Sequence, residues 1–171
     1  MLFRSLKNIF FSFNDNTKLF TSYNNSNKLH RNILVDVLAK NNLLNDGIVT
    51  ILHPNIWPNR PGDYKFEYYD GTILKDEPSF VLNSCDAFAP NSFPKSYLNG
   101  FIDIVTESTY EEDQFFLTEK TSKPISTLKP FLIVGPPKIH KFLYENYGVE
   151  YYDELFDYSF DDETEIGRAH V

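Results

Sequence analysis

Residues 18–52 read KLFTSYNNSNKLHRNILVDVLAKNNLLNDGIVTIL, and their pattern sets the fold class. Two short apolar runs, 18–23 and 48–52, are typical of buried strands. Between them, apolar residues recur at helical spacing from Leu29 to Leu38. Two strands joined through a helix over about 35 residues must run parallel, and such crossovers are right-handed. The stretch therefore predicts a βαβ unit.

The rest of the chain returns to this alternation after an interval without clear periodicity. Residues 53–99 are interrupted by prolines, and only 80–82 resembles a buried strand, so we expect an irregular insertion there. Beyond it the patterns predict strands at 101–105, 131–134 and 149–152, and helices at 118–128 and 138–147. Short apolar strands are typical of a parallel sheet covered on both faces. We expect a doubly wound, Rossmann-like α/β domain over residues 1–165.

The composition excludes several classes of protein. The chain has 171 residues, 42% hydrophobic and 23% charged, which suits one globular domain. The net charge of −8 argues against a general nucleic-acid binder, and Cys85, the single cysteine, excludes internal disulfides and cysteine-based zinc sites. No apolar run approaches the roughly 20 residues that span a bilayer. We expect a soluble, cytoplasmic protein without a membrane span.

The last six residues, 166–171, read IGRAHV, which a widely used sequencing adapter encodes in one reading frame before a stop codon. The preceding chain is rich in Asn, Lys, Phe, Tyr and Ile and poor in arginine, so the tail differs from it in composition. We interpret the tail as foreign to the protein and the chain as a fragment. The alternative is a natural terminus.

Basic residues stand at three predicted helix starts. Lys28, His30 and Arg31 open the first helix, Lys120 follows Glu119 in the second, and Lys138 begins the third. Cations at a helix N-terminus oppose the helix dipole by about 0.3 to 1 kcal/mol each, and ligands of doubly wound folds bind at this edge. The pattern favours a bound phosphate group, although solvated lysines would explain each site taken singly.

Other motifs narrow the choice of ligand. The turn Gly135-Pro136-Pro137 lacks the amide donors of a phosphate-binding loop, and neither a Walker A sequence nor a Gly-x-Gly-x-x-Gly fingerprint occurs. No Asp-x-Asp pair is present to hold a divalent ion. We therefore expect no NAD, ATP or metal cofactor, and we interpret the acidic groups at 111–113 and 161–163 as solvated.

A few further side chains could carry chemistry. His53 follows the second predicted strand and is a candidate general base, or simply a turn histidine before Pro54. Cys85 lacks the surroundings that would make it a nucleophile. Aromatic residues could form a stacking surface for a sugar or base, but most are expected in the core, among them Trp57, Tyr64, Tyr68 and Tyr69.

One segment carries a family resemblance. Residues 115–125 read FFLTEKTSKPI and are followed by KPFLIVG at 129–135. This pattern resembles the donor-binding half of fucosyltransferase-like glycosyltransferases, which have the two-lobed GT-B fold. The residues at 147–152 and 156–161, and the Leu29-His30-Arg31 start, are similar to the same group, so the resemblance covers about half of the chain.

The resemblance implies a site and a reaction. In that family the Glu of the Thr-Glu-Lys motif contacts the donor sugar or its ribose and the Lys contacts the diphosphate, without a metal. Transferred to this chain, the motif is Thr118, Glu119 and Lys120. A complete GT-B enzyme has two lobes and is about twice this long, and residues 53–99 match no part of it.

The sequence supports two hypotheses. The first is a metal-independent glycosyltransferase that moves a sugar from a nucleotide-diphosphate donor to a glycan or other hydroxyl acceptor. Lys120 and Arg31 would stabilise the departing diphosphate, Glu119 would orient the sugar or ribose, and His53 would be the base if the reaction inverts. The second is a non-catalytic domain of the same fold that binds a protein or glycan partner.

Overall fold

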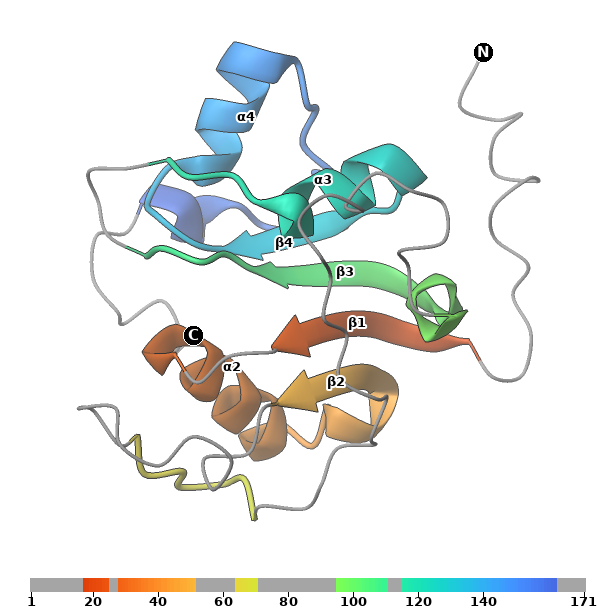
Figure 1. Ribbon diagram of the computed structural model, residues 1–171, viewed down its shortest axis with the longest axis vertical. Helices are drawn as coiled ribbons and strands as arrows, with labels where there is room; N and C mark the ends of the chain where they lie inside the picture. Colours follow the sequence, from red (N-terminus) through yellow and green to blue (C-terminus); the bar gives the residue numbers. More distant parts are fainter. Residues whose placement is uncertain (1–16, 25–27, 52–63, 71–94, 111–114, 163–171) are drawn as a thin grey trace.

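The computed structural model is an α/β fold built on a four-stranded, all-parallel sheet with strand order β2-β1-β3-β4 (Figure 1). It describes residues 17–24, 28–51, 64–70, 95–110 and 115–162. The strands are β1 Lys18–Asn24, β2 Gly47–Ile51, β3 Gly100–Thr106 and β4 Phe131–Val134. The helices are α2 Leu29–Lys40, α3 Glu119–Thr127 and α4 Ile139–Tyr147, with short 3-10 helices at Leu44–Asp46, Lys95–Asn99 and Ser159–Asp162.

The predicted βαβ unit is confirmed, since β1 and β2 pair in parallel and α2 connects them. The strands β3 and β4 and the helices α3 and α4 are also confirmed to within two residues at each end. Local signals explain this agreement. Gly148 ends α4 in the left-handed conformation (φ +66°), and Thr118 caps α3 by accepting the Lys120 amide.

Both faces of the sheet are covered, as expected for a doubly wound fold. On one face Phe20 and Val49 pack with Val35 and Leu38 of α2. Side chains alternate along a strand, so the opposite face carries Val105, which packs with Phe131, Ile133, Ile139 and Leu143. The helix α4 therefore covers the face opposite α2.

The prediction of a strand at 149–152 is wrong, because these residues form an irregular segment. A strand beside β4 would need the outward amide of Ile133, which instead donates to Nε2 of His140 at 3.0 Å. The other ring nitrogen, Nδ1, bonds Oδ1 of Asp161 at 2.9 Å. Asp161 is only 6% exposed, so its interpretation as a solvated carboxylate is also wrong.

The segment at 64–70 is held by one carboxylate of α2. Asp36 accepts the backbone amides of Glu67, Tyr68 and Tyr69 at 2.8 to 2.9 Å and the hydroxyl of Tyr64 at 2.9 Å. Tyr69 lies in the core as expected, whereas Tyr68 is exposed. The segment is therefore packed against α2 through polar as well as aromatic contacts.

Several predicted features lie outside the described residues: His53, Trp57, Cys85, the strand at 80–82, the acidic group at 111–113, Glu163 and the tail at 166–171. Within the described ranges, no helix is long and apolar enough to cross a membrane.

Candidate functional site

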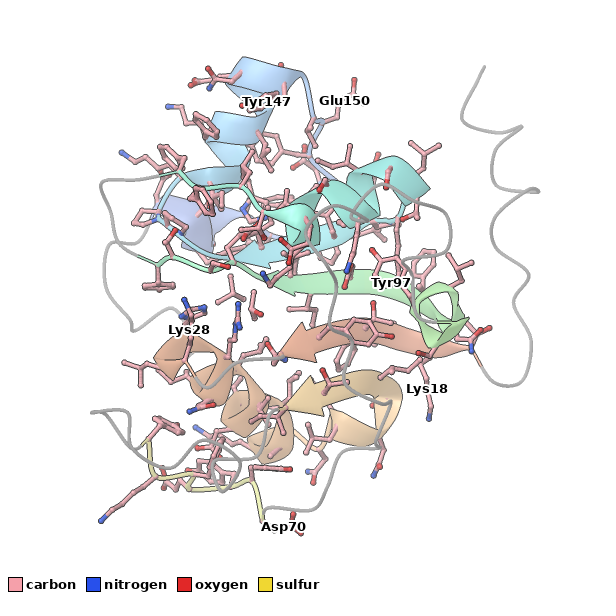
Figure 2. All side chains as sticks on the ribbon, viewed as in Figure 1. Lys18, Lys28, Asp70, Tyr97, Tyr147 and Glu150 are labelled. Atoms are coloured by element: carbon pink, nitrogen blue, oxygen red, sulfur yellow. The ribbon has the colours of Figure 1, made fainter. Side chains whose placement is uncertain are left out.

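The candidate site lies where the carboxyl ends of β1 and β3 meet. The crossover from β1 leads through α2 to β2, while that from β3 leads through α3 to β4 on the other side. The starts of α2 and α3 therefore flank one gap, which is where doubly wound sheets bind ligands. Figure 2 shows Lys28 at this end of the sheet and Tyr97 at the opposite end.

Glu107, directly after β3, binds the start of α3. Its buried carboxylate accepts the Thr118 amide at 3.0 Å and hydroxyl at 2.7 Å, the Ser108 amide at 3.1 Å, and the Thr121 hydroxyl. A helix N-terminus attracts negative charge. Glu107 supplies that charge from within the protein, so the backbone amides at the start of α3 are already partly satisfied.

The basic residues at the start of α2 contact the backbone carbonyl groups of the same turn. Nε2 of His30 lies 2.8 Å from the Glu107 carbonyl, and Arg31 donates to the carbonyls of Thr106 at 3.2 Å and Glu107 at 3.3 Å. Lys28 donates to the Ser108 carbonyl. The protein's own carbonyls and the Glu107 carboxylate therefore meet part of the demand for an anion that these cations create.

Burial changes the charge available from α2. It lowers the pKa of His30 to about 4, against the opposing hydrogen bond to the Glu107 carbonyl, so the imidazole is neutral near pH 7. Burial also lowers the pKa of Arg31, while the negative charges of Glu107 and Glu119 raise it. Arg31 is buried against β3, and His30 stacks on Tyr110 with ring centroids 5.6 Å apart. Both side chains are thus held by the fold.

Lys120 reaches the turn from α3. Its ammonium bonds the Ser108 hydroxyl at 3.2 Å, the Thr118 hydroxyl at 3.3 Å and Glu119 at 3.2 Å, and 22% of the side chain is exposed. Burial raises the pKa of Glu119. The charge of Lys120 and hydrogen bonds lower it by more than burial raises it, so the net shift is downward. Glu119 and Lys120 therefore form a charged pair at the start of α3, beside Ser108.

The structure brings two of the three predicted basic helix starts together. Lys28 and Lys120 come from different helices, yet both ammonium groups bond Ser108, one at its carbonyl and the other at its hydroxyl. Lys138 does not join them. It is exposed at the start of α4, where its backbone amide donates to the Asp161 carbonyl at 2.7 Å.

Sequence reasoning missed two residues of this site, Glu107 and Ser108. Their available signal was a polar pair directly after the apolar strand β3. Lys123 follows Glu119 and Lys120 at the i+4 and i+3 spacing that puts the three residues on one face of α3. Lys123 is 8% exposed.

A second polar network lies toward the opposite end of the sheet. Asp103 accepts the Tyr97 hydroxyl at 2.6 Å and the Thr21 hydroxyl at 3.0 Å. Lys129 donates to Thr21 at 2.7 Å and to the Tyr97 carbonyl at 2.8 Å, and it lies 4.2 Å from the centroid of the Tyr97 ring. Lys129 and Thr21 are fully buried, so this network joins β1, β3 and the end of α3 rather than meeting a ligand.

Among the residues that the structure describes, no group of three or more His, Cys, Asp or Glu side chains could hold a metal ion. The ammonium groups of Lys28 and Lys120, which both bond Ser108, suit an anionic ligand. Comparison with known protein families, with curated proteins and with solved structures finds no match to this chain.

Proposed function

We propose that this chain is the donor-binding domain of a glycosyltransferase, which transfers a sugar from a nucleotide-diphosphate sugar to the hydroxyl of a glycan or another acceptor. The convergence of Lys28 and Lys120 on Ser108 carries the proposal. Two ammonium groups that meet at one turn repel each other, and a diphosphate between them would turn that repulsion into attraction. The turn lies at the edge where doubly wound folds bind nucleotides.

The same groups suit the chemistry of the reaction. When the glycosidic bond to the donor phosphate breaks, negative charge grows on the departing diphosphate. Lys120 and Lys28 would stabilise that charge, with Lys120 held in place by the Thr118 hydroxyl. Glu119, beside Lys120, would accept hydrogen bonds from hydroxyls of the sugar or ribose. An inverting reaction would also need a base on the acceptor, and His53 remains the candidate.

The resemblance of the Thr118-Glu119-Lys120 segment to fucosyltransferase-like enzymes supports this choice over other anion-binding functions. In the structure these residues form the start of α3, at the edge of the sheet where the carboxyl ends of β1 and β3 meet. Arg31 and His30 take a different role from Lys120, since they bond the carbonyls at the end of β3. We assign them to holding the turn in position, and Lys28 and Lys120 to contacting the diphosphate.

The experiment is a calorimetric titration of the full chain and of Lys120→Ala with nucleoside, nucleoside diphosphate and sugar nucleotide. Loss of one charge-assisted hydrogen bond should weaken diphosphate binding by about 1.5 to 3 kcal/mol and leave nucleoside binding unchanged. Lys141→Ala is the matched control, because this substitution removes the same charge from a side chain that is 56% exposed on α4. Equal isotherms for all three proteins would favour the non-catalytic binding domain.

Metal independence is tested in the same titration. Because lysines take the place of a divalent ion in the proposal, sugar-nucleotide binding should survive excess chelator. Binding that disappears with chelator and returns with manganese would refute the role of Lys120 as the charge partner of the diphosphate.

A further inference from the structure

Ser108, the half-buried residue on which Lys28 and Lys120 converge, has one hydrogen-bond donor that the fold does not use. Its backbone amide donates to the Glu107 carboxylate at 3.1 Å, and its carbonyl accepts from Lys28. Its hydroxyl oxygen accepts from Lys120 at 3.2 Å. A serine hydroxyl also has a hydrogen to donate, and within the ranges that the structure describes no acceptor receives it.

The ammonium group of Lys120, unlike the Ser108 hydroxyl, has its hydrogens bonded within the protein. Its three donors reach Ser108, Thr118 and Glu119 at 3.2 to 3.3 Å. The Thr118 hydroxyl in turn donates to Glu107 at 2.7 Å. A ligand must replace one of these bonds to receive a hydrogen from Lys120 or Thr118. The Ser108 hydroxyl can donate to a ligand without such a loss.

The charges beside Ser108 favour a negatively charged acceptor for this hydrogen. The ammonium groups of Lys28 and Lys120 approach the residue from two different helices. A hydroxyl that accepts from an ammonium group becomes a stronger donor, because hydrogen bonds in a chain polarise one another. The Glu107 carboxylate is also near, but it already accepts from the Ser108 amide and from Thr118. A phosphate oxygen carries negative charge and only accepts, so it matches the unused donor.

We propose that Ser108 contacts the ligand of this site directly, by donating its hydroxyl hydrogen to a phosphate oxygen of the diphosphate that Lys28 and Lys120 attract. This inference rests on the proposed function and deepens it, because it names the residue that sets the position of one phosphate group. An ammonium group attracts phosphate as a point charge, whereas a hydroxyl directs its hydrogen bond to a single oxygen.

The test uses Ser108→Ala in the full chain, which removes the hydroxyl and keeps the backbone contacts. Thermal unfolding is recorded without ligand, and calorimetry follows with inorganic pyrophosphate, nucleoside diphosphate and nucleoside. Affinity for pyrophosphate and nucleoside diphosphate should fall about 10-fold, as expected for one hydrogen bond to a charged group, and nucleoside affinity should change less than about twofold. The melting temperature should stay within about 3 °C of wild type, because Lys120 keeps Thr118 and Glu119 as acceptors.

Three companion variants make the test specific. Ser108→Thr keeps a hydroxyl and should retain diphosphate affinity to within about threefold. Ser108→Cys keeps the size but has only a weak donor, so it should lose as much affinity as Ser108→Ala, and it replaces that variant if alanine unfolds the turn. Ser126→Ala is the matched control, because it removes a hydroxyl that donates to the Lys123 carbonyl within α3, and it should leave diphosphate affinity unchanged.

Two results would overturn the inference. The first is diphosphate affinity in Ser108→Ala equal to that of wild type. The second is a clearly lower melting temperature with an equal loss of affinity for nucleoside and diphosphate, which would identify a structural role.

The outcomes also separate this inference from the proposed function. Full-strength sugar-nucleotide binding by Ser108→Ala, with loss in Lys120→Ala, would refute the Ser108 contact and keep the donor site. Wild-type binding of pyrophosphate but not of any nucleotide, weakened in Ser108→Ala, would keep the contact and refute the nucleotide donor. A wild-type protein that binds none of these ligands would overturn both.

Discussion

Two buried lysines, Lys123 on α3 and Lys129 just beyond its end, have opposite environments. Lys129 is fully buried and donates to Thr21 and to the Tyr97 carbonyl, with Asp103 bonded to the same threonine. Lys123 is almost as buried but has no direct partner among the described residues. Lys129 therefore connects parts of the fold, and removing it would leave buried polar groups without their partner. The two lysines therefore differ in what holds their side chains, although they lie six residues apart in the chain.

We expect the greatest loss of stability when the side chain of Lys129 is removed. Lys129→Ala leaves the buried Asp103 without the cation that acts on it most strongly and opens a cavity, so it should lower the unfolding free energy by about 3 to 5 kcal/mol. The same change at Lys123 should cost less than about 1 kcal/mol, because its ammonium group forms no hydrogen bond or ion pair with the residues that the structure describes. Urea denaturation of both variants measures the contrast. Equal losses would show that the two lysines have similar structural roles.

Glu107 tests the binding end of the sheet. Glu107→Gln keeps the shape but puts an amide NH2 group among donors, including the amides of Ser108 and Thr118. We expect a loss of about 2 kcal/mol in unfolding free energy, from the weakened contact with the start of α3. Denaturation of the variant at neutral pH measures it. A change below about 0.5 kcal/mol would mean that Glu107 does not hold α3 to β3.

The pKa of Lys129 predicts how the stability of the protein depends on pH. Burial, the dominant cause, lowers its pKa to about 8 against the attraction of Asp103. Lysine in the unfolded chain has a pKa of about 10.4, so the unfolded state binds more protons between these two values and stability rises with pH there. From about pH 8 to about pH 10, wild type should gain about 2 kcal/mol relative to Lys129→Met. Parallel pH profiles for the two proteins would contradict the shift.

The smallest expected effect concerns Lys138, the predicted phosphate ligand that the structure leaves apart from Ser108. Its backbone adopts φ +63°, a conformation that costs a non-glycine residue about 1 kcal/mol. Lys138→Gly should therefore raise the unfolding free energy by about 0.5 kcal/mol and leave diphosphate affinity unchanged. Weaker diphosphate binding in this variant would show that Lys138 contributes to the site.

The elements of the fold could be predicted from local sequence because their signals are local. Apolar runs mark β1 to β4, helical spacing marks α2, and Gly148 ends α4. Parallel pairing of β1 and β2 followed from the length of the connection. The segment at 149–152 shows the limit: its apolar pattern suited a strand, but His140 had already taken the β4 amide that a strand would need.

Charge pairing could not be predicted in this way, because it depends on residues far apart in the chain. The sequence marked Lys28, Arg31 and Lys120 as cations at helix starts on one edge of a parallel sheet. Folding decided that Arg31 donates to the carbonyls at the end of β3, that Lys28 and Lys120 meet at Ser108, and that Lys129 bonds Thr21. Periodicity reports which side of an element is buried, whereas hydrogen-bond partners are set by the packing of separate elements in space.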